Sequence, residues 1–257
     1  MTQAQIVAIY RYPVKGLSAQ AMADGVELAA GETVPLDRAY AIENGPGAFN
    51  PAAPRHLPKV TFLCLMHDER LAELQTGFGE ENGRHELTIA RAQRHLVSGD
   101  LGTPAGREAI AAFVAREFAD ELRGRPRVVS AQGHSFSDVR EKCLHIVNLA
   151  SVRALEHTIG HAVDPLRFRP NVVIDGLPAW AELDLVGREI GLGGATLGVF
   201  KRTQRCAATD VEPATAKRNG DLPGHLALTL GHRDFGVYAT VTGGGRIKPG
   251  NRLLLTS

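Results

Sequence analysis

The chain has 257 residues, of which 44% are hydrophobic, and a formal net charge of +1. A nearly neutral chain lacks the global electrostatic field that favours nucleic acid or an acidic membrane surface, so we expect neither as a partner. A chain of this length can form one large domain or two ordinary ones, and its 28 glycines and 14 prolines favour short strands over a helical bundle.

The amino-terminal segment, residues 1–11, lacks the basic and then apolar layout of a secretory signal peptide. No stretch approaches the roughly 20 consecutive apolar residues that a membrane-spanning helix needs. The three cysteines are widely spaced, which is typical neither of a disulfide framework nor of a zinc site and fits a reducing compartment. The sequence therefore predicts a soluble protein of the cytoplasm.

Most of the chain consists of short segments that are rich in β-branched residues and bounded by turn-forming residues, which is typical of strands. In chain order, the predicted strands are Ile6–Val14, Val34–Ile42, Val60–Met66, Glu86–Ala90, Arg127–Ser130, Leu144–Asn148, Asn171–Ile174, Ala195–Lys201, Val237–Val241 and Arg252–Thr256. The glycine-rich segments 191–194 and 243–245 are interpreted as hairpin turns and not as phosphate loops, because no evident helix follows either of them.

Two segments have the pattern of a helix. Thr103 and Pro104 offer a capping residue and a proline at the first helical position, and apolar side chains recur at helical spacing over residues 110–122. Gly124 follows as a stop signal. A shorter helix is predicted at residues 151–160, where the last residue is a glycine.

These elements predict a mostly β (α+β) chain with a few short helices. The polar segment 123–127 contains glycine and proline and is the predicted boundary between two parts of the chain. The first part would span residues 1–124 and the second residues 125–257.

Cys206 has the surroundings of a reactive thiolate. Arg205 precedes it, and two further cations occupy positions 201 and 202. Cationic neighbours favour the thiolate, which is the form of cysteine that attacks electrophiles and binds soft metals. Cys64 and Cys143 lie instead within or beside apolar segments and are interpreted as buried strand residues.

Several cations occur where predicted strands end, which is where a barrel presents its loops. Lys15 follows the first strand, Arg38 lies in the second, and Arg167 and Arg169 precede the strand that begins at Asn171. Guanidinium groups suit bidentate contact with phosphate or carboxylate, and lysine adds a point charge beside them. Together these residues predict an anion pocket, whereas each taken alone reads as a solvated surface charge.

Seven motifs occur in order along the chain. They are Tyr12-Pro13-Val14-Lys15-Gly16, Asp37-Arg38, RHLPKV at 55–60, RFRPNVVI at 167–174, RCAATDVEP at 205–213, DFGVY at 234–238 and GRIKPGN at 245–251. By their order and spacing, the chain resembles MOSC-domain proteins that carry an N-terminal MOSC β-barrel domain, and in particular the amidoxime-reducing molybdenum enzymes. It departs from the pattern at Gly16, where some relatives carry serine.

The resemblance implies an N-terminal MOSC β-barrel domain with a helical segment at residues 1–124, followed by a MOSC β-barrel domain at residues 125–257. It also implies a molybdenum cofactor (Mo-molybdopterin), which is a metal on a pterin dithiolene with an anionic phosphate tail. By its position in the motif, Cys206 would be the metal ligand and the catalytic residue. The implied cofactor-binding residues are Lys15, Arg38, Asn148, Arg169, Asn171, Arg205, Cys206 and Thr209.

The implied activity is that of a molybdenum cofactor-dependent oxidoreductase, which removes oxygen from small N-hydroxylated compounds by reducing the N–O bond. Three cysteines cannot supply the four ligands of an ordinary iron–sulfur cluster, so we expect electrons from a separate reductase or redox protein. Two alternatives stay open: a carrier or storage module for the cofactor, and a sulfur carrier with a persulfide on Cys206.

Overall fold

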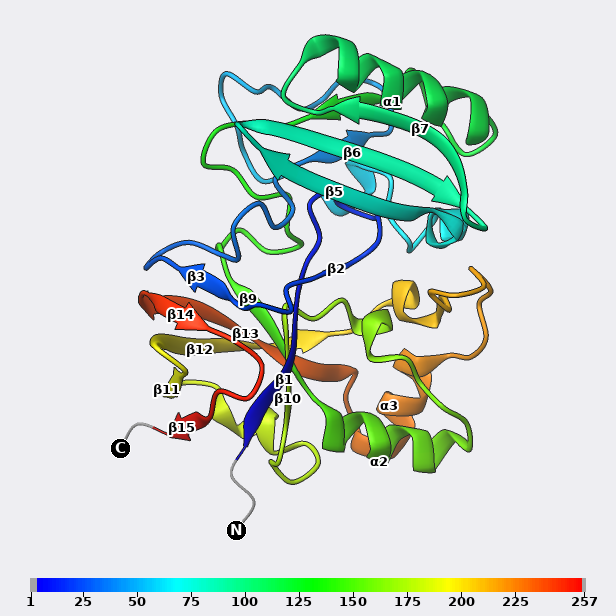
Figure 1. Cartoon of the computed structure of the whole chain (residues 1–257). Helices are drawn as coiled ribbons and strands as arrows, with labels where there is room; N and C mark the ends of the chain where they lie inside the picture. The colour runs from blue at the N-terminus through cyan, green and yellow to red at the C-terminus, as the bar shows by residue number, and fades with distance from the viewer. Residues whose placement is uncertain (1–3, 256–257) are drawn as a thin grey trace.

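An eight-stranded sheet forms the largest part of the computed structural model, which describes residues 4–255 (Figure 1). The strand order is β15-β11-β12-β13-β9-β10-β1-β2. The strands are β1 (Gln5–Arg11), β2 (Gln20–Ala21), β9 (Leu144–Asn148), β10 (Val172–Asp175), β11 (Glu189–Leu192), β12 (Ala195–Gln204), β13 (Asp234–Gly243) and β15 (Leu253–Leu255). Within this sheet only β9 and β10 pair in parallel, and α2 (Leu149–Ile159) lies in the crossover between them.

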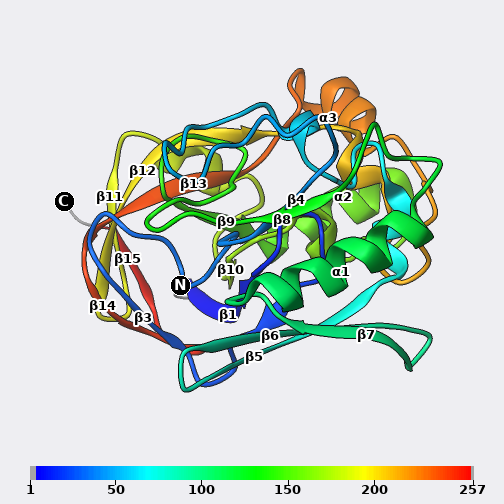
Figure 2. The ribbon, with the colours of Figure 1, turned by 90° about the horizontal axis from the view of Figure 1, so that it is seen from above.

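Smaller sheets are built mainly from the first half of the chain. β3 (Val26–Leu28) pairs with β14 (Gly245–Ile247), and β4 (Ala41–Glu43) pairs with β8 (Arg127–Val129). The strands β5 (Gln75–Glu81), β6 (Arg84–Arg91) and β7 (Arg94–Asp100) form an antiparallel meander. The helix α1 (Pro104–Glu117) packs on this meander at the end of the molecule away from both termini (Figures 1 and 2).

Strands from the start of the chain complete the sheets of its second half. β1 inserts between β2 and β10, and β3 supplies the partner of β14. A division between residues 124 and 125 stays a prediction, and any such division separates strands that pair with one another.

Two main cores stabilise the two ends of the molecule. Ile146, Val172 and Val237 belong to the core of the large sheet and are fully buried. At the other end, Ile110 and Phe113 on one face of α1 are buried in the core that the helix shares with the meander. Complete burial of each such side chain contributes about 1.5–3 kcal/mol to stability, so both cores stabilise the fold.

The helix signals in the sequence are largely confirmed. The Thr103 side chain accepts a hydrogen bond from the Gly106 amide at 3.1 Å and caps α1. This helix ends at Glu117, earlier than predicted, although the following apolar residues still pack in the core. Gly160 ends α2 in the left-handed conformation, with φ of +80°.

A third helix, α3 (Leu222–Leu230), was not predicted, because its Pro-Gly start reads as a turn. The Asp221 carboxylate accepts a hydrogen bond from the Gly224 amide at 2.8 Å, and the proline occupies the first turn, where it needs no hydrogen bond. Among the described residues, none of the helices combines the length and the apolar character needed to cross a bilayer.

The predicted strand Val60–Met66 is wrong. The segment begins with a 3-10 turn at Lys59–Thr61 and continues as a loop. Its apolar side chains serve two different cores, since Phe62 packs in a small aromatic cluster and Leu63 packs in the core under α1. A regular strand would send neighbouring side chains to opposite faces of one sheet, which does not satisfy both cores.

Other strand predictions need smaller corrections. Of Val34–Ile42, only the end is strand, because Leu36 and Arg38 adopt positive φ angles of 61° and 51° in a turn. The segment 191–194 contains the predicted hairpin turn, at Gly193 and Gly194 between β11 and β12, but 243–245 join strands with different partners. Thr256 of the last predicted strand lies outside the described residues. The predicted fold class, mostly β with a few short helices, is confirmed.

Candidate functional site

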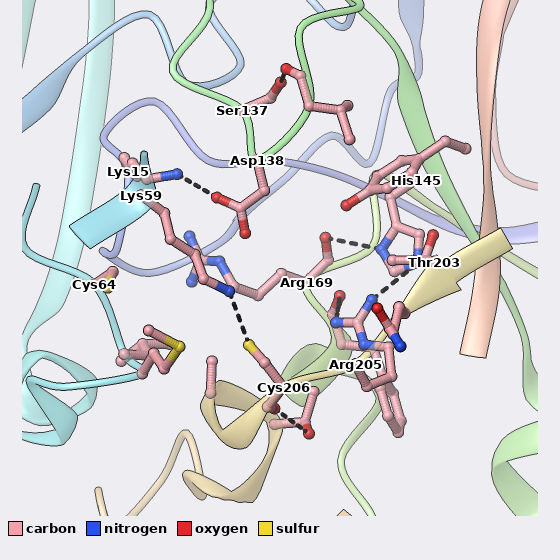
Figure 3. Close-up of a pocket in the computed structure, with 18 of the residues that line it drawn as sticks. Lys15, Lys59, Cys64, Ser137, Asp138, His145, Arg169, Thr203, Arg205 and Cys206 are labelled. Carbon is pink, nitrogen blue, oxygen red and sulfur yellow. Dashed lines mark hydrogen bonds and ion pairs between the residues drawn. The ribbon is translucent and has the colours of Figure 1, made fainter. Parts of the chain in front are cut away.

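A cavity of about 430 Å³ lies where the loops of the first half of the chain meet the large sheet (Figure 3). Its lining draws on the predicted site residues Lys15, Arg38, Arg169, Asn171, Arg205, Cys206 and Thr209. These residues come from segments as far apart as the loop after β1 and the turn after β12. The fold therefore brings together all but one of the predicted residues.

Asn148 is the exception, because it does not line the cavity. It caps α2 by accepting a hydrogen bond from the Ala150 amide at 3.2 Å, and its amide group donates to Glu182 at 3.2 Å. The side chain is fully buried beneath the helix and does not line the cavity. Its position in the sequence at the end of β9 made it resemble a site residue, but its polar atoms serve a helix terminus.

Lys15 is buried and already has partners. Its ammonium group donates to the Phe136 carbonyl at 2.9 Å and forms an ion pair with Asp138. Burial would raise the pKa of Asp138, but the Lys15 charge and hydrogen bond lower that pKa below its ordinary value. The positive charge of Lys15 in the cavity is therefore already balanced by the negative charge of Asp138.

Arg38 and Arg169 are placed on the same aromatic ring. Their guanidinium carbons lie 4.6 and 4.2 Å from the centre of the Tyr12 ring. Arg38 forms an ion pair with Asp37, whereas Nη2 of Arg169 is buried and has no hydrogen-bond partner among the described residues. Burial lowers the pKa of Arg169 to about 10. An unpartnered buried donor is costly, which fits a ligand that brings an acceptor.

Asn171 and Thr209 line the wall but also hold it together. The Asn171 amide oxygen accepts from the His145 backbone at 3.1 Å, and its amide nitrogen donates to the Tyr10 carbonyl at 3.2 Å, which ties β9 to β1. The Thr209 hydroxyl donates to the Cys206 carbonyl at 2.9 Å and fixes the turn that follows the cysteine.

Arg167, one of the cations expected in the anion pocket, already has partners within the chain. Its side chain is fully buried, forms an ion pair with Glu212, and also donates to Asn219. It further donates to the carbonyls of Thr209 and Asp210, at 3.4 and 3.3 Å. Although it lines the cavity, the structure uses it as a brace for the loop that carries Cys206.

Cys206 has one close partner that the sequence did not reveal. It directly precedes the 3-10 turn Ala207–Asp210, and its sulfur accepts a hydrogen bond from the Lys59 ammonium group at 3.1 Å (Figure 3). Burial would lower the pKa of Lys59, but the bond to Cys206 raises it. Lys59 lies inside the motif at residues 55–60, and its position there is the signal that could have nominated it.

Arg205 and His145 form a second group that the sequence analysis did not join. Arg205 donates to the Phe168 carbonyl at 2.9 Å and lies 3.4 Å from Nε2 of His145. Burial and the Arg205 charge lower the pKa of His145 well below its ordinary value, so the imidazole is neutral. Nε of Arg205 and the hydroxyl of Thr203 are buried without partners among the described residues.

All three cysteines line the cavity, contrary to the expectation for Cys64 and Cys143. Both are buried as predicted, but neither lies in a strand: Cys64 is in a loop, and Cys143 directly precedes β9. Burial raises the pKa of Cys64 and raises that of Cys143 to about 12, which keeps both as neutral thiols. Cys206 differs from them by its ammonium partner.

The donor set fits a group that joins a soft metal to an anionic tail. The lining contains eight lysine and arginine side chains and one carboxylate, that of Asp138. It also contains unpartnered donors and one sulfur in contact with a cation. Among the described residues, no cluster of three or more His, Cys, Asp or Glu could hold a metal ion by itself.

Comparisons with known proteins match the second half of the chain to a family. A family model described as "MOSC domain" matches residues 131–253. No curated protein matches the chain.

The chain is also similar to three solved structures. YiiM from Geobacillus stearothermophilus is 25% identical over 44% of this chain and 54% of its own, with a TM-score of 0.36. The YuaD protein from Bacillus subtilis is 13% identical over 98% of this chain and 95% of its own, with a TM-score of 0.46. YiiM from Escherichia coli is 21% identical over 44% and 54%, with a TM-score of 0.32.

The chain thus spans about half the length of the two YiiM proteins. The family match covers the cavity wall that carries Cys206, Arg205, Arg169 and Asn171. The match to the MOSC domain model therefore accounts for residues 131–253, just under half of the chain.

Proposed function

We propose that the chain is a molybdenum cofactor-dependent reductase that removes oxygen from N-hydroxylated compounds, with electrons from a separate redox partner. One observation carries the proposal: the Cys206 sulfur shares a single cavity with Lys15, Arg38, Arg169 and Arg205. MOSC domains as a family are associated with the molybdenum cofactor, and this donor set has the chemistry that such a cofactor needs.

The residues divide between the two ends of such a ligand. Cys206 would bind the metal, because thiolate is a soft ligand. Arg38 and Arg169, stacked on Tyr12, would contact the phosphate, and the unpartnered Nη2 of Arg169 would gain an acceptor there. Arg205 would contribute its buried Nε on the same wall.

When bound, the cofactor would supply the two-electron chemistry that breaks the N–O bond, with two protons taken up and water released. The chain itself would hold the surroundings at fixed charge. His145 stays neutral, and burial raises the pKa of Tyr238 to about 12, so its phenol keeps its proton at the cavity wall. Both groups can donate or accept hydrogen bonds without adding net charge.

The test is the metal and pterin content of the chain produced in a host that makes the cofactor. We expect near-stoichiometric molybdenum in the wild type and reduction of an amidoxime with reduced viologen as the electron donor. Cys206→Ser should lose most of the metal and at least about 100-fold in rate, because a hydroxyl is a poor ligand for a soft metal.

Cys143→Ser is the matched control, since Cys143 lines the same cavity as a neutral thiol and should keep both metal and activity. Full activity in Cys206→Ser would reject the assignment of the ligand. Cofactor bound without turnover on any N–O substrate would favour a carrier or storage module instead.

A sulfur carrier is the second candidate, because Cys206 is partly exposed and its sulfur contacts a cation. Mass spectrometry of the chain after incubation with a sulfur donor would detect a persulfide on Cys206. A persulfide that is passed to an acceptor, in a chain that binds no molybdenum, would favour this candidate over the reductase.

A further inference from the structure

A second, smaller pocket of about 150 Å³ adjoins the large cavity. Four residues line both spaces: Gly16, Leu65, Arg167 and Arg169. The other lining residues come from the loop after β1, from two 3-10 turns and from the segment after Asp210. The pocket therefore lies at a junction between the two halves of the chain.

Most of the wall of this second pocket is hydrocarbon. Leu17 follows β1, Leu71 lies in the 3-10 turn Glu69–Glu73, and Val211 follows the turn after Cys206. Each of the three side chains is buried. An apolar cavity of about 150 Å³ can stay dry and bind a molecule of the size of benzene. The wall therefore favours a compact apolar group over water.

The two hydroxyl groups of the lining already have hydrogen-bond partners. The Tyr12 hydroxyl donates to the Pro170 carbonyl at 3.2 Å, and the Ser18 hydroxyl donates to the Leu74 carbonyl at 2.6 Å. Neither group needs a ligand to satisfy it. Among the described residues that line the pocket there is no Asp or Glu, so the wall itself supplies no negative charge.

Arg167 and Arg169 bring positive charge and unused donors to the pocket. Nε of Arg167 and Nη2 of Arg169 are both buried without a hydrogen-bond partner among the described residues. The terminal nitrogens of Arg167 are bound to other groups, and its charge is balanced by Glu212. Arg169 stacks on Tyr12 instead. Because unpartnered buried donors are costly, two of them in one wall favour a ligand with two acceptor oxygens.

We propose that this pocket is a second binding site, for a small monocarboxylate with a compact apolar body of about the size of benzene. The carboxylate oxygens accept hydrogen bonds from the unpartnered donors of Arg167 and Arg169. The apolar body packs against Leu17, Leu71 and Val211, which removes its surface from water. The site is a property of the chain and does not depend on a cofactor in the large cavity.

The two arginines connect this site to the large cavity, because they line both spaces. Under the proposed function, Arg169 would also contact the cofactor phosphate. A carboxylate in the pocket and a phosphate in the cavity would then compete for the same donor and weaken the binding of one another equally. Only this coupling rests on the proposed function.

The test is titration of the full, cofactor-free chain with benzoate, followed by NMR of the methyl groups. We expect a dissociation constant of about 1 mM or lower, with the resonances of Leu17, Leu71 and Val211 shifting together. Benzamide has the same shape without the charge, and acetate has the charge without the ring. Each should bind at least about tenfold more weakly than benzoate.

Variants locate the ligand in the pocket and not in the large cavity. Ala72 lines only the pocket, so Ala72→Leu should fill it and weaken benzoate binding at least about tenfold. Ala112→Leu, at an exposed position of α1, is the matched control and should change binding by less than about twofold. Arg169→Met should remove the preference for benzoate over benzamide. Arg38→Met should keep that preference, because Arg38 lines only the large cavity.

Thermal unfolding of each variant excludes a general loss of fold. Benzoate that binds no better than benzamide would overturn the role of the two arginines, and equal binding to the wild type and Ala72→Leu would overturn the pocket as the site. Benzoate binding by a chain that never acquires molybdenum keeps this site and rejects the reductase. No benzoate binding by a chain that carries molybdenum when made with the cofactor rejects this site and keeps the reductase.

Discussion

On the cavity wall built by residues 12–66, the cations already have anionic or sulfur partners, whereas on the wall built by residues 167–206 several donors have none. Arg38 is paired with Asp37, and Lys59 contacts the Cys206 sulfur. On the second wall, Nη2 of Arg169 and Nε of Arg205 are buried without partners among the described residues.

The difference separates two tasks within one site. Unpartnered buried donors gain most from an acceptor-rich ligand, so the second wall, which lies within the matched residues 131–253, would supply the larger part of the binding energy. The first wall would close the cavity and place the Lys59 ammonium group against the sulfur. Under the proposed function, the matched segment would hold the ligand, and the preceding segment would complete the cavity.

The largest test of this comparison removes the brace behind the second wall. Arg167→Met leaves Glu212 and Asn219 without the guanidinium between them, and we expect a loss of about 3–5 kcal/mol in the free energy of unfolding. Urea unfolding measures it. Arg202→Met, at an exposed pair with Asp184, should lose less than about 1 kcal/mol. A loss of similar size in both variants would show that the wall does not depend on a buried charge.

A second test concerns pH and the neutral His145 on the second wall. Its folded pKa lies well below the unfolded value, so the unfolded chain binds the proton more readily. Stability is then fully present above the unfolded pKa of about 6.5 and falls as pH decreases below it, by up to about 1.4 kcal/mol per pH unit.

His145→Gln should flatten this part of the curve of unfolding free energy against pH. His157→Gln, at an exposed position of α2, controls for the loss of an imidazole. An identical slope in wild type and His145→Gln would mean that the histidine is not held neutral by its surroundings.

The smallest effect is expected where Arg218 joins the two walls. Its side chain is about one-third exposed, and Arg218→Met should cost about 0.5–1 kcal/mol in stability. Because the bonds to Ala207 and Met66 are lost, amide hydrogen exchange should quicken around those residues and stay unchanged in α1. Unchanged exchange near Ala207 would show that Arg218 does not stabilise the contact between the two walls.

Local patterns in the sequence located much of the fold. The strand Leu144–Asn148, the cap at Thr103 and the terminating Gly160 follow the prediction, because each depends on neighbouring residues alone. The strand prediction for Val60–Met66 is wrong, because adjacent side chains of this segment pack in two different cores. Composition alone does not reveal such a split.

For the site, the sequence by itself determined the chemistry available: a cysteine among cations and a set of basic residues at strand ends. Only the tertiary structure decided the pairing. In the folded chain Lys59 donates a hydrogen bond to the Cys206 sulfur, Arg167 forms an ion pair with Glu212, and Asn148 caps a helix. The reason is physical: such contacts join residues far apart in the chain, so they exist only after the cores and sheets have fixed both partners.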